Sequence, residues 1–195
     1  MAELTQRQEQ IIDKAIRLID QKGIQGLTIK NLAKETGVTE GAIYRHFENK
    51  KQILCAILDM FREKMKSFQA SGRSAEKSTY EKIQVTLNNL GKFFEANPAI
   101  VSVIFAEEIF QNDNELSEKV AELIKENQEF MLALIQEGKA NGELRRDLDD
   151  QMMVSSILGS FRLIVKMWKM EEFSVSLENS LENLMDYLKA TIFIQ

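Results

Sequence analysis

Apolar residues recur at intervals of three and four along most of the chain, which is the spacing that α-helices produce. The first helical segment begins after Thr5, which forms a capping-box pattern with Gln8, and runs to about Gly23. Its apolar positions are Ile11, Ile12, Ala15, Ile16, Leu18 and Ile19. The chain contains one proline and nine glycines, so few residues interrupt such helices. The pattern predicts an all-α fold of about nine helices.

Three further amphipathic segments follow, and each begins at a residue that can cap a helix. Thr28 precedes "IKNLAKE", which Gly37 can end in a left-handed conformation, and Thr39 precedes "EGAIYRHF". Asn49 and Gln52 then repeat a capping arrangement at the start of a longer helix. Two short helices joined by a glycine-containing turn are typical of a helix-turn-helix. We therefore expect an N-terminal three-helix head.

The second short helix carries side chains suited to a DNA groove. Ile43 and Phe47 are four residues apart and should face inward. A recognition helix needs small residues where its backbone approaches DNA, and polar or basic side chains that reach bases and phosphates. The residues of these kinds are Thr39, Gly41, Ala42, Tyr44, Arg45, His46 and Lys50. Each alone also fits an ordinary surface position, so the prediction of DNA binding rests on the ordered set of caps, turn, small residues and basic end.

The charge of the chain is unevenly distributed. The net charge is −5, which by itself disfavours a polyanionic partner. Residues 1–60 nevertheless contain nine Lys or Arg against eight Asp or Glu, whereas the rest of the chain contains 16 against 22. Because salt screens distant charges, the acidic C-terminal part does not prevent the head from binding DNA.

The segment "LTIKNLAKETGVTEGAIYRHFENKKQIL" closely resembles the DNA-binding domain of TetR-family transcriptional regulators, and the resemblance covers about residues 5–65. The matching positions are Thr28, Gly37, Val38, Thr39, Gly41, Tyr44, His46, Phe47, Lys50 and Leu54. The resemblance implies a homodimer, usually a repressor, that binds a palindromic operator and is released by a small molecule. It places DNA contacts at Thr28, Lys30, Thr39, Gly41, Ala42, Tyr44, His46 and Lys50. Glu40 and Arg45 fall at variable positions that help to set the operator sequence.

We expect two domains. The first is a homeodomain-like head at residues 1–65, with the helix-turn-helix at about 28–47. The second is a helical body at residues 66–195 for effector binding and dimerisation. The small and polar stretch 70–78 between them predicts a hinge.

The first of the last two predicted helices is apolar on two faces, so it must be covered by more than one partner, and the final helix repeats the spacing of one such stripe. One stripe can pack on the chain itself and another on a second copy in a four-helix bundle, although burial within the monomer remains an alternative. The predicted dimer interface consists of Val154, Leu158, Phe161, Val165, Leu177, Leu181, Leu184 and Leu188.

Aromatic residues and methionines of the body suggest an apolar cavity for an apolar or amphipathic effector. The residues we assign to this effector site are Phe94, Phe105, Met131 and Trp168. Residues of this kind at helical spacing also form ordinary hydrophobic cores, and that alternative stays open.

Other functions find little support. The chain has one histidine and one cysteine, both in the head, so neither a Cys-His nor a Ser-His-Asp set can form in the body. We find no phosphate-binding glycine loop and no His-Glu-x-x-His pair, and we expect no enzyme, cofactor or metal site. Without a signal peptide or a long apolar stretch, we expect a cytoplasmic protein. A DNA-binding helical dimer with an architectural or protein-partner role and no effector is the alternative function.

Overall fold

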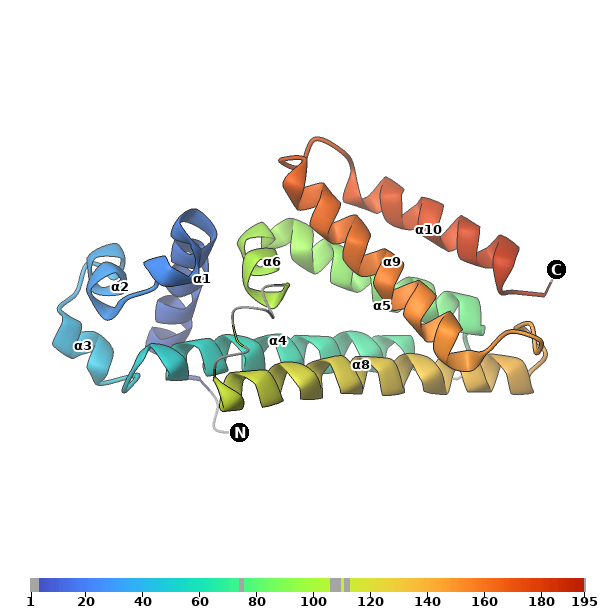
Figure 1. Cartoon of the computed structure of the whole chain (residues 1–195), viewed down its shortest axis with the longest axis horizontal. Helices are drawn as coiled ribbons and strands as arrows, with labels where there is room; N and C mark the ends of the chain where they lie inside the picture. Colours follow the sequence, from blue (N-terminus) through green and yellow to red (C-terminus); the bar gives the residue numbers. More distant parts are fainter. Residues whose placement is uncertain (1–3, 74–75, 106–109, 111–112, 195) are drawn as a thin grey trace. The chain divides into compact units, whose positions relative to one another are not determined.

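The computed structural model describes residues 4–73, 76–105, 110 and 113–194. The fold is all-α, as predicted, and nine helices are defined within those residues (Figure 1). They are α1 Gln6–Gly26, α2 Ile29–Thr36, α3 Glu40–Tyr44, α4 Lys50–Gly72, α5 Thr79–Ala96, α6 Pro98–Ile104, α8 Asn114–Ala140, α9 Asp150–Met170 and α10 Leu177–Thr191.

The chain divides into two compact units, and α4 and α8 each contribute to both. Unit 1 comprises residues 1–62 and 98–121, and unit 2 comprises residues 63–97 and 122–195. Unit 1 therefore contains α6 and the start of α8 in addition to the helices of the predicted head. The stretch 70–78, expected to be a hinge between head and body, lies within unit 2. Its small and polar residues end α4 and precede α5, while the chain passes from unit 1 to unit 2 inside α4.

Unit 1 is built around α1, which contacts both α2 and α6. The predicted capping box is present, with the Thr5 hydroxyl accepting from the Gln8 amide and the Gln8 side chain accepting from the Thr5 amide. Regular helix stops at Gly23, whose φ of 66° is the left-handed conformation that glycine adopts without a steric penalty. The Ser102 hydroxyl of α6 donates a 2.8 Å hydrogen bond to Asp20 of α1.

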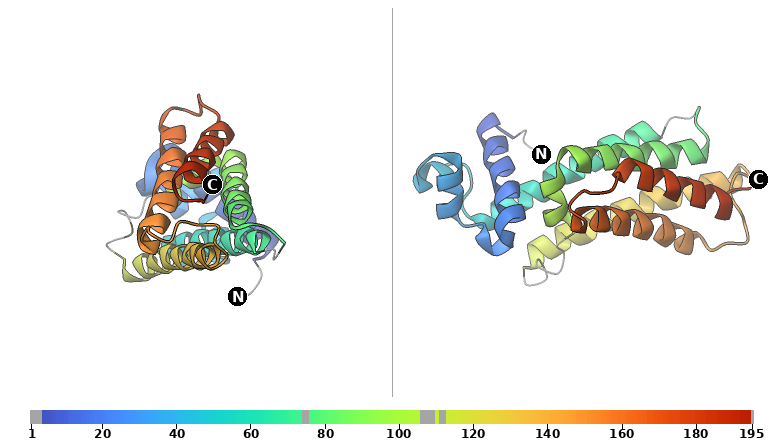
Figure 2. Two further views of the ribbon diagram at one scale, coloured as in Figure 1. Left: turned by 90° about the vertical axis from the view of Figure 1, so that its right-hand side faces the viewer. Right: turned by 90° about the horizontal axis from the view of Figure 1, so that it is seen from above.

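In unit 2, α5, α9 and α10 all contact one another, and Figure 2 shows α10 alongside both α5 and α9. The first turn of α5 is held by a second capping box, between Ser78 and Glu81. Lys82 of the same helix is buried, with 4% of its surface exposed, and its Nζ lies 2.5 Å from an oxygen of Glu137 in α8. Because a buried ammonium is costly without a partner, this ion pair helps to fix α5 against α8.

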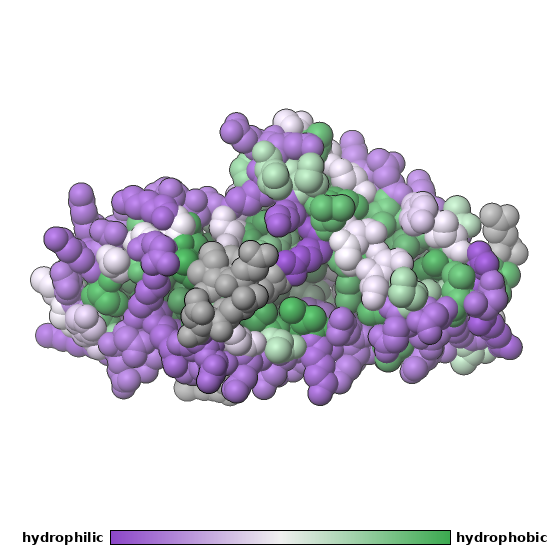
Figure 3. Space-filling view, viewed as in Figure 1, coloured by the Kyte–Doolittle hydropathy of each residue, from purple (hydrophilic) through white to green (hydrophobic). Residues whose placement is uncertain are grey.

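The residues predicted to form the dimer interface are instead covered by their own chain. All of them are buried within the single chain except Leu158, which is half-buried. The reason is that α9 packs on α5 and α10 of the same chain, so these two helices cover the stripe. The outward face of α9 is a different set with helical spacing, namely Met152, Ser155, Ser156, Gly159, Leu163, Lys166, Met167 and Met170. Figure 3 shows pale and apolar residues along α9, whereas hydrophilic residues dominate around α2 and α3.

Candidate nucleic-acid interface

The turn between α2 and α3 is fixed by short-range hydrogen bonds. The Thr28 hydroxyl accepts from the Asn31 amide at 3.1 Å and caps α2. Gly37 ends α2 with a φ of 68°, the left-handed cap predicted for it. The amide of Val38 donates back to the Ala33 carbonyl at 3.0 Å. Only three residues, 37–39, separate α2 from α3, so this short turn sets the angle between the two helices.

Helix α3 is capped by Thr39, whose hydroxyl accepts from the Ala42 amide at 3.2 Å. It is shorter than the segment "EGAIYRHF" suggests, because the helix ends at Tyr44 and the amides of His46 and Phe47 both donate to the Ile43 carbonyl in a closing turn. Ile43 and Phe47 are buried as predicted and anchor the C-terminal part of α3 and the turn that follows it. The opposite face is thereby held in a fixed orientation.

That outward face of α3 and the start of α2 together carry most of the predicted DNA contacts. Tyr44 is 52% exposed, and Thr28, Lys30, Thr39, Glu40, Gly41 and Arg45 are also exposed, whereas Ala42 and His46 are half-buried. A Cβ at Gly41 would meet nothing nearer than the Thr39 hydroxyl at 3.9 Å, and Gly41 has no positive φ. The fold therefore does not require glycine there. Its effect is to leave the backbone of α3 open to a close approach from outside.

The cations of unit 1 fall into two classes. Lys30, Lys34 and Arg45 are exposed and form no ion pair within the part of the chain that the structure describes. Lys34 was not among the predicted contacts, although it lies four residues after Lys30 and so on the same face of α2. Lys50, a predicted contact, instead donates a 2.6 Å hydrogen bond to the Ile24 carbonyl, and its partial burial lowers its pKa. Lys51 pairs with Glu115 of α8 at 2.7 Å.

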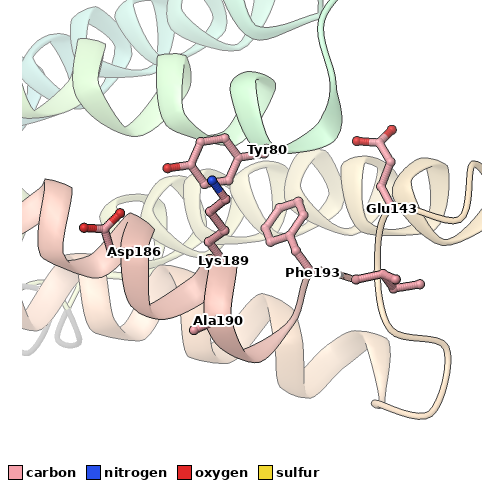
Figure 4. A pocket seen from close by; sticks show the side chains of 7 residues that line it. Tyr80, Glu143, Asp186, Lys189, Ala190 and Phe193 are labelled. Atoms are coloured by element: carbon pink, nitrogen blue, oxygen red, sulfur yellow. The ribbon is translucent and has the colours of Figure 1, made fainter.

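The four predicted effector residues do not come together in one unit. Phe94, Met131 and Trp168 are buried in unit 2, whereas Phe105 belongs to unit 1 and is half-buried. A surface pocket of about 530 Å³ does occur in unit 2, at the C-terminal end of α10 (Figure 4). It is lined by other residues, which are Tyr80, Glu143, Asp186, Lys189, Ala190, Phe193 and Ile194.

The residues that the structure describes also bear on metal sites and on membrane spans. Among them no group of three or more His, Cys, Asp or Glu side chains is placed to hold a metal ion. None of the helices defined there combines the length and the apolar character needed to span a bilayer.

Comparison with known proteins agrees with this architecture. Residues 11–57 match the family "Bacterial regulatory proteins, tetR family", and residues 57–190 match "YsiA-like protein, C-terminal region". The chain is 30% identical over 184 residues to the fatty acid metabolism regulator protein of Bacillus subtilis, covering 90% of this chain and 92% of that protein. The nucleoid occlusion factor SlmA of Vibrio atlanticus is 23% identical over 154 residues, covering 78% and 79%.

A solved structure extends the similarity to the whole fold. The transcriptional regulator FadR from Bacillus subtilis in complex with stearoyl-CoA superposes with a TM-score of 0.77 at 25% identity, covering 94% of this chain and 97% of that one. The two family matches together cover the helix-turn-helix and nearly all of the helices that follow it. The chain therefore belongs to the TetR family of bacterial transcriptional regulators, which bind DNA operators, and carries a YsiA-like C-terminal region.

Proposed function

We propose that this regulator is a repressor that binds a palindromic operator as a homodimer and is released by a long-chain acyl-CoA. The observation that carries the DNA-binding part is the outward face of α3, where Tyr44 and Arg45 project from an element anchored by Ile43 and Phe47. A short helix held in this way can place side chains at base edges with little loss of conformational entropy on binding.

We assign a role to each DNA contact from the bonds that its side chain forms in the absence of DNA. Arg45 and Tyr44 read bases or adjoining phosphates, and Lys30 and Lys34 hold the backbone from α2. The hydroxyl groups of Thr28 and Thr39 accept their helix-capping bonds and can at the same time donate a hydrogen bond to a phosphate. Lys50 reaches DNA only by exchanging its bond to the Ile24 carbonyl for one to a phosphate, so its net contribution should be smaller than that of Arg45.

The effector class rests on relatives of nearly the same length. The relative from Bacillus subtilis is named as a fatty acid metabolism regulator, and FadR from the same organism was solved with stearoyl-CoA. Both similarities include the C-terminal region. The buried Phe94, Met131 and Trp168 give unit 2 an apolar interior suited to an acyl chain. Acyl-CoA can release DNA only if it binds the free conformation more tightly than the operator-bound one.

The dimer uses the outward face of α9, in our proposal, rather than the buried stripe. Leu163 is 60% exposed and Met170 67% exposed, and both lie on the same face as Gly159. A Cβ at Gly159 would meet nothing within 4 Å, so a second helix can approach closely there. The same face on a second copy makes an isologous four-helix bundle with α10, where Tyr187 is also exposed.

The charged variant Leu163→Glu tests this interface, since it should convert the dimer to monomer without unfolding the chain. The matched control is Ile124→Glu, which changes another exposed apolar residue of unit 2, on α8. Sedimentation equilibrium of both variants measures the outcome. If the Leu163→Glu protein were still a dimer, the interface would not lie on this face of α9.

Operator binding and release are measured together by fluorescence anisotropy, with DNA from upstream of the gene and scrambled DNA at two salt concentrations. We expect a specific complex that weakens with salt and is dissociated by stearoyl-CoA, but not by coenzyme A or stearate alone. A specific complex unaffected by any acyl-CoA would reject the effector class. Salt-sensitive binding without sequence preference would favour the architectural alternative, which similarity to a nucleoid occlusion factor keeps in view.

A further inference from the structure

The pocket at the end of α10 lies entirely within unit 2 and has a preformed aromatic floor. The rings of Tyr80 and Phe193 meet edge to face, with centroids 5.4 Å apart. Phe193 is held by a β-bridge to Leu144, and the amide of Ile194 donates to the Glu143 carbonyl at 2.9 Å. These bonds tie the residues that follow α10 to the loop between α8 and α9. The aromatic surface therefore does not depend on a ligand to assemble.

Carboxylates outnumber ammonium groups around this floor. Glu143 is fixed at one wall, because its carboxylate accepts from the Thr79 amide at 2.6 Å. Asp186 lies on the other side, and burial together with the charge of Asp186 raises the pKa of Tyr80. Lys189 is the single cation among the lining residues. Its Nζ lies 5.5 Å from the centre of the Tyr80 ring, so this ring already receives a positive group (Figure 4).

We propose that this pocket binds a small organic cation with an apolar tail, such as an alkylammonium, whose charged group replaces Lys189 Nζ on the face of Tyr80. The lining carries two carboxylates against one ammonium, which favours a cation over an anion of similar size. The lining residues Phe193, Ala190 and Ile194 offer apolar surface for the tail. Lys189 is exposed, so its flexible side chain can turn into solvent when the ligand enters. The site does not depend on the proposed operator or on acyl-CoA.

The probe is hexyltrimethylammonium, titrated into the full chain by isothermal calorimetry and compared with hexanoate, hexanol and coenzyme A. The cation should bind, and the neutral and anionic compounds should bind at least about tenfold more weakly, which is 1.4 kcal/mol. Equal binding of hexanol would mean a merely apolar groove and would overturn the proposal. Tighter binding of hexanoate or coenzyme A would overturn it by identifying an anion site.

Two variants should change the affinity for the cation in opposite directions. Tyr80→Leu removes the ring face and should abolish binding of the cation. Lys189→Met removes the internal competitor and a like charge, and should tighten binding about two- to fivefold, the range expected for one exposed cation–π contact. Lys92→Met, which removes an exposed lysine of α5 outside the pocket, is the matched control and should change nothing.

Unchanged or weaker binding in Lys189→Met would overturn the proposal even if Tyr80→Leu failed to fold, because Lys189 lies on the surface. Circular dichroism checks the fold of each variant. The titrations contain no DNA, so their failure is separate from a failure of operator binding or of release by acyl-CoA.

Discussion

The α2–α3 turn and the α9–α10 pair differ in how their geometry is determined. In the turn, hydrogen bonds between residues at most five apart in sequence, such as Thr28 to Asn31 and Thr39 to Ala42, fix which face points outward. In the helix pair, Leu181 is buried because α10 meets α5, a helix that lies some 90 residues earlier. Local bonds thus set the candidate DNA face, whereas long-range packing sets which apolar face of α9 remains open.

The sharpest way to break this comparison is to remove a side chain of α10 that long-range packing buries. Leu181 touches the backbone of α5 so closely that a Cβ at Gly91 would lie 2.5 Å from its Cδ1. Leu181→Ala should leave a cavity and lower the free energy of unfolding by about 2–5 kcal/mol. Urea unfolding at a fixed protein concentration measures the change.

The control for Leu181→Ala is Glu182→Ala, the next residue on α10, which is exposed. It should change the free energy of unfolding by less than about 0.5 kcal/mol. Equal effects of the two variants would mean that α10 is not packed on α5 through this face. The stripe that contains Leu181 would then again be available for a second copy.

The next prediction concerns which cations of unit 1 bind DNA. Arg45→Ala should weaken specific operator binding by about 1–3 kcal/mol, roughly five- to 150-fold, because an exposed arginine on α3 can bond base edges. Lys51→Met should change it far less, since that lysine is already paired with Glu115. Anisotropy titrations of both variants on one operator make the comparison, and similar losses would show that the ion pair does not withhold Lys51 from DNA.

Sequence was sufficient for the head because its signals are local. Thr5, Thr28 and Thr39 cap helices as predicted, and Gly37 takes its left-handed conformation. It was insufficient for Lys50, whose bond to the Ile24 carbonyl joins residues 26 apart. No spacing rule for α9 could show which stripe the chain itself covers, since both repeat at three and four. The pocket at Tyr80 was also not predicted, because it combines residues from α5, from α10, from the loop between α8 and α9 and from the segment after α10.

A smaller effect is expected at the cap of α3. Thr39→Ala removes the acceptor for the Ala42 amide and should lower the free energy of unfolding by about 1 kcal/mol. Thr39→Ser keeps the hydroxyl and should restore most of that loss. Urea unfolding without DNA separates this effect from any direct contact of Thr39 with an operator. If the alanine and serine variants were equally stable, the cap would not be what holds α3.

The smallest effect is expected from the ion pair between α4 and α8 in unit 1. The hydrogen bond from Lys51 lowers the pKa of Glu115 below its ordinary value near 4.5. A lowered carboxyl pKa stabilises the fold above the unfolded-state value, and this contribution disappears as the pH falls through the folded-state value. Lys51→Met should therefore be less stable than the parent chain at pH 7, and the difference should shrink on acidification below pH 4.5.

Urea unfolding of the two proteins at pH 7 and at about pH 3.5 measures that shrinkage. The control is Lys30→Met, which removes an exposed lysine that forms no ion pair with any described residue. The difference in free energy of unfolding between Lys30→Met and the parent chain should be the same at both pH values, because Lys30 does not pair with Glu115. Glu115 is exposed and 43% of the Lys51 side chain is exposed, so solvent weakens their attraction and the effect is modest. A difference that stayed constant across this range would mean that Lys51 stabilises unit 1 by packing its aliphatic stem rather than by pairing with α8. In that case the ammonium group of Lys51 would be available to DNA, and Lys50 alone would remain as a cation of this region that is held by a bond within the chain.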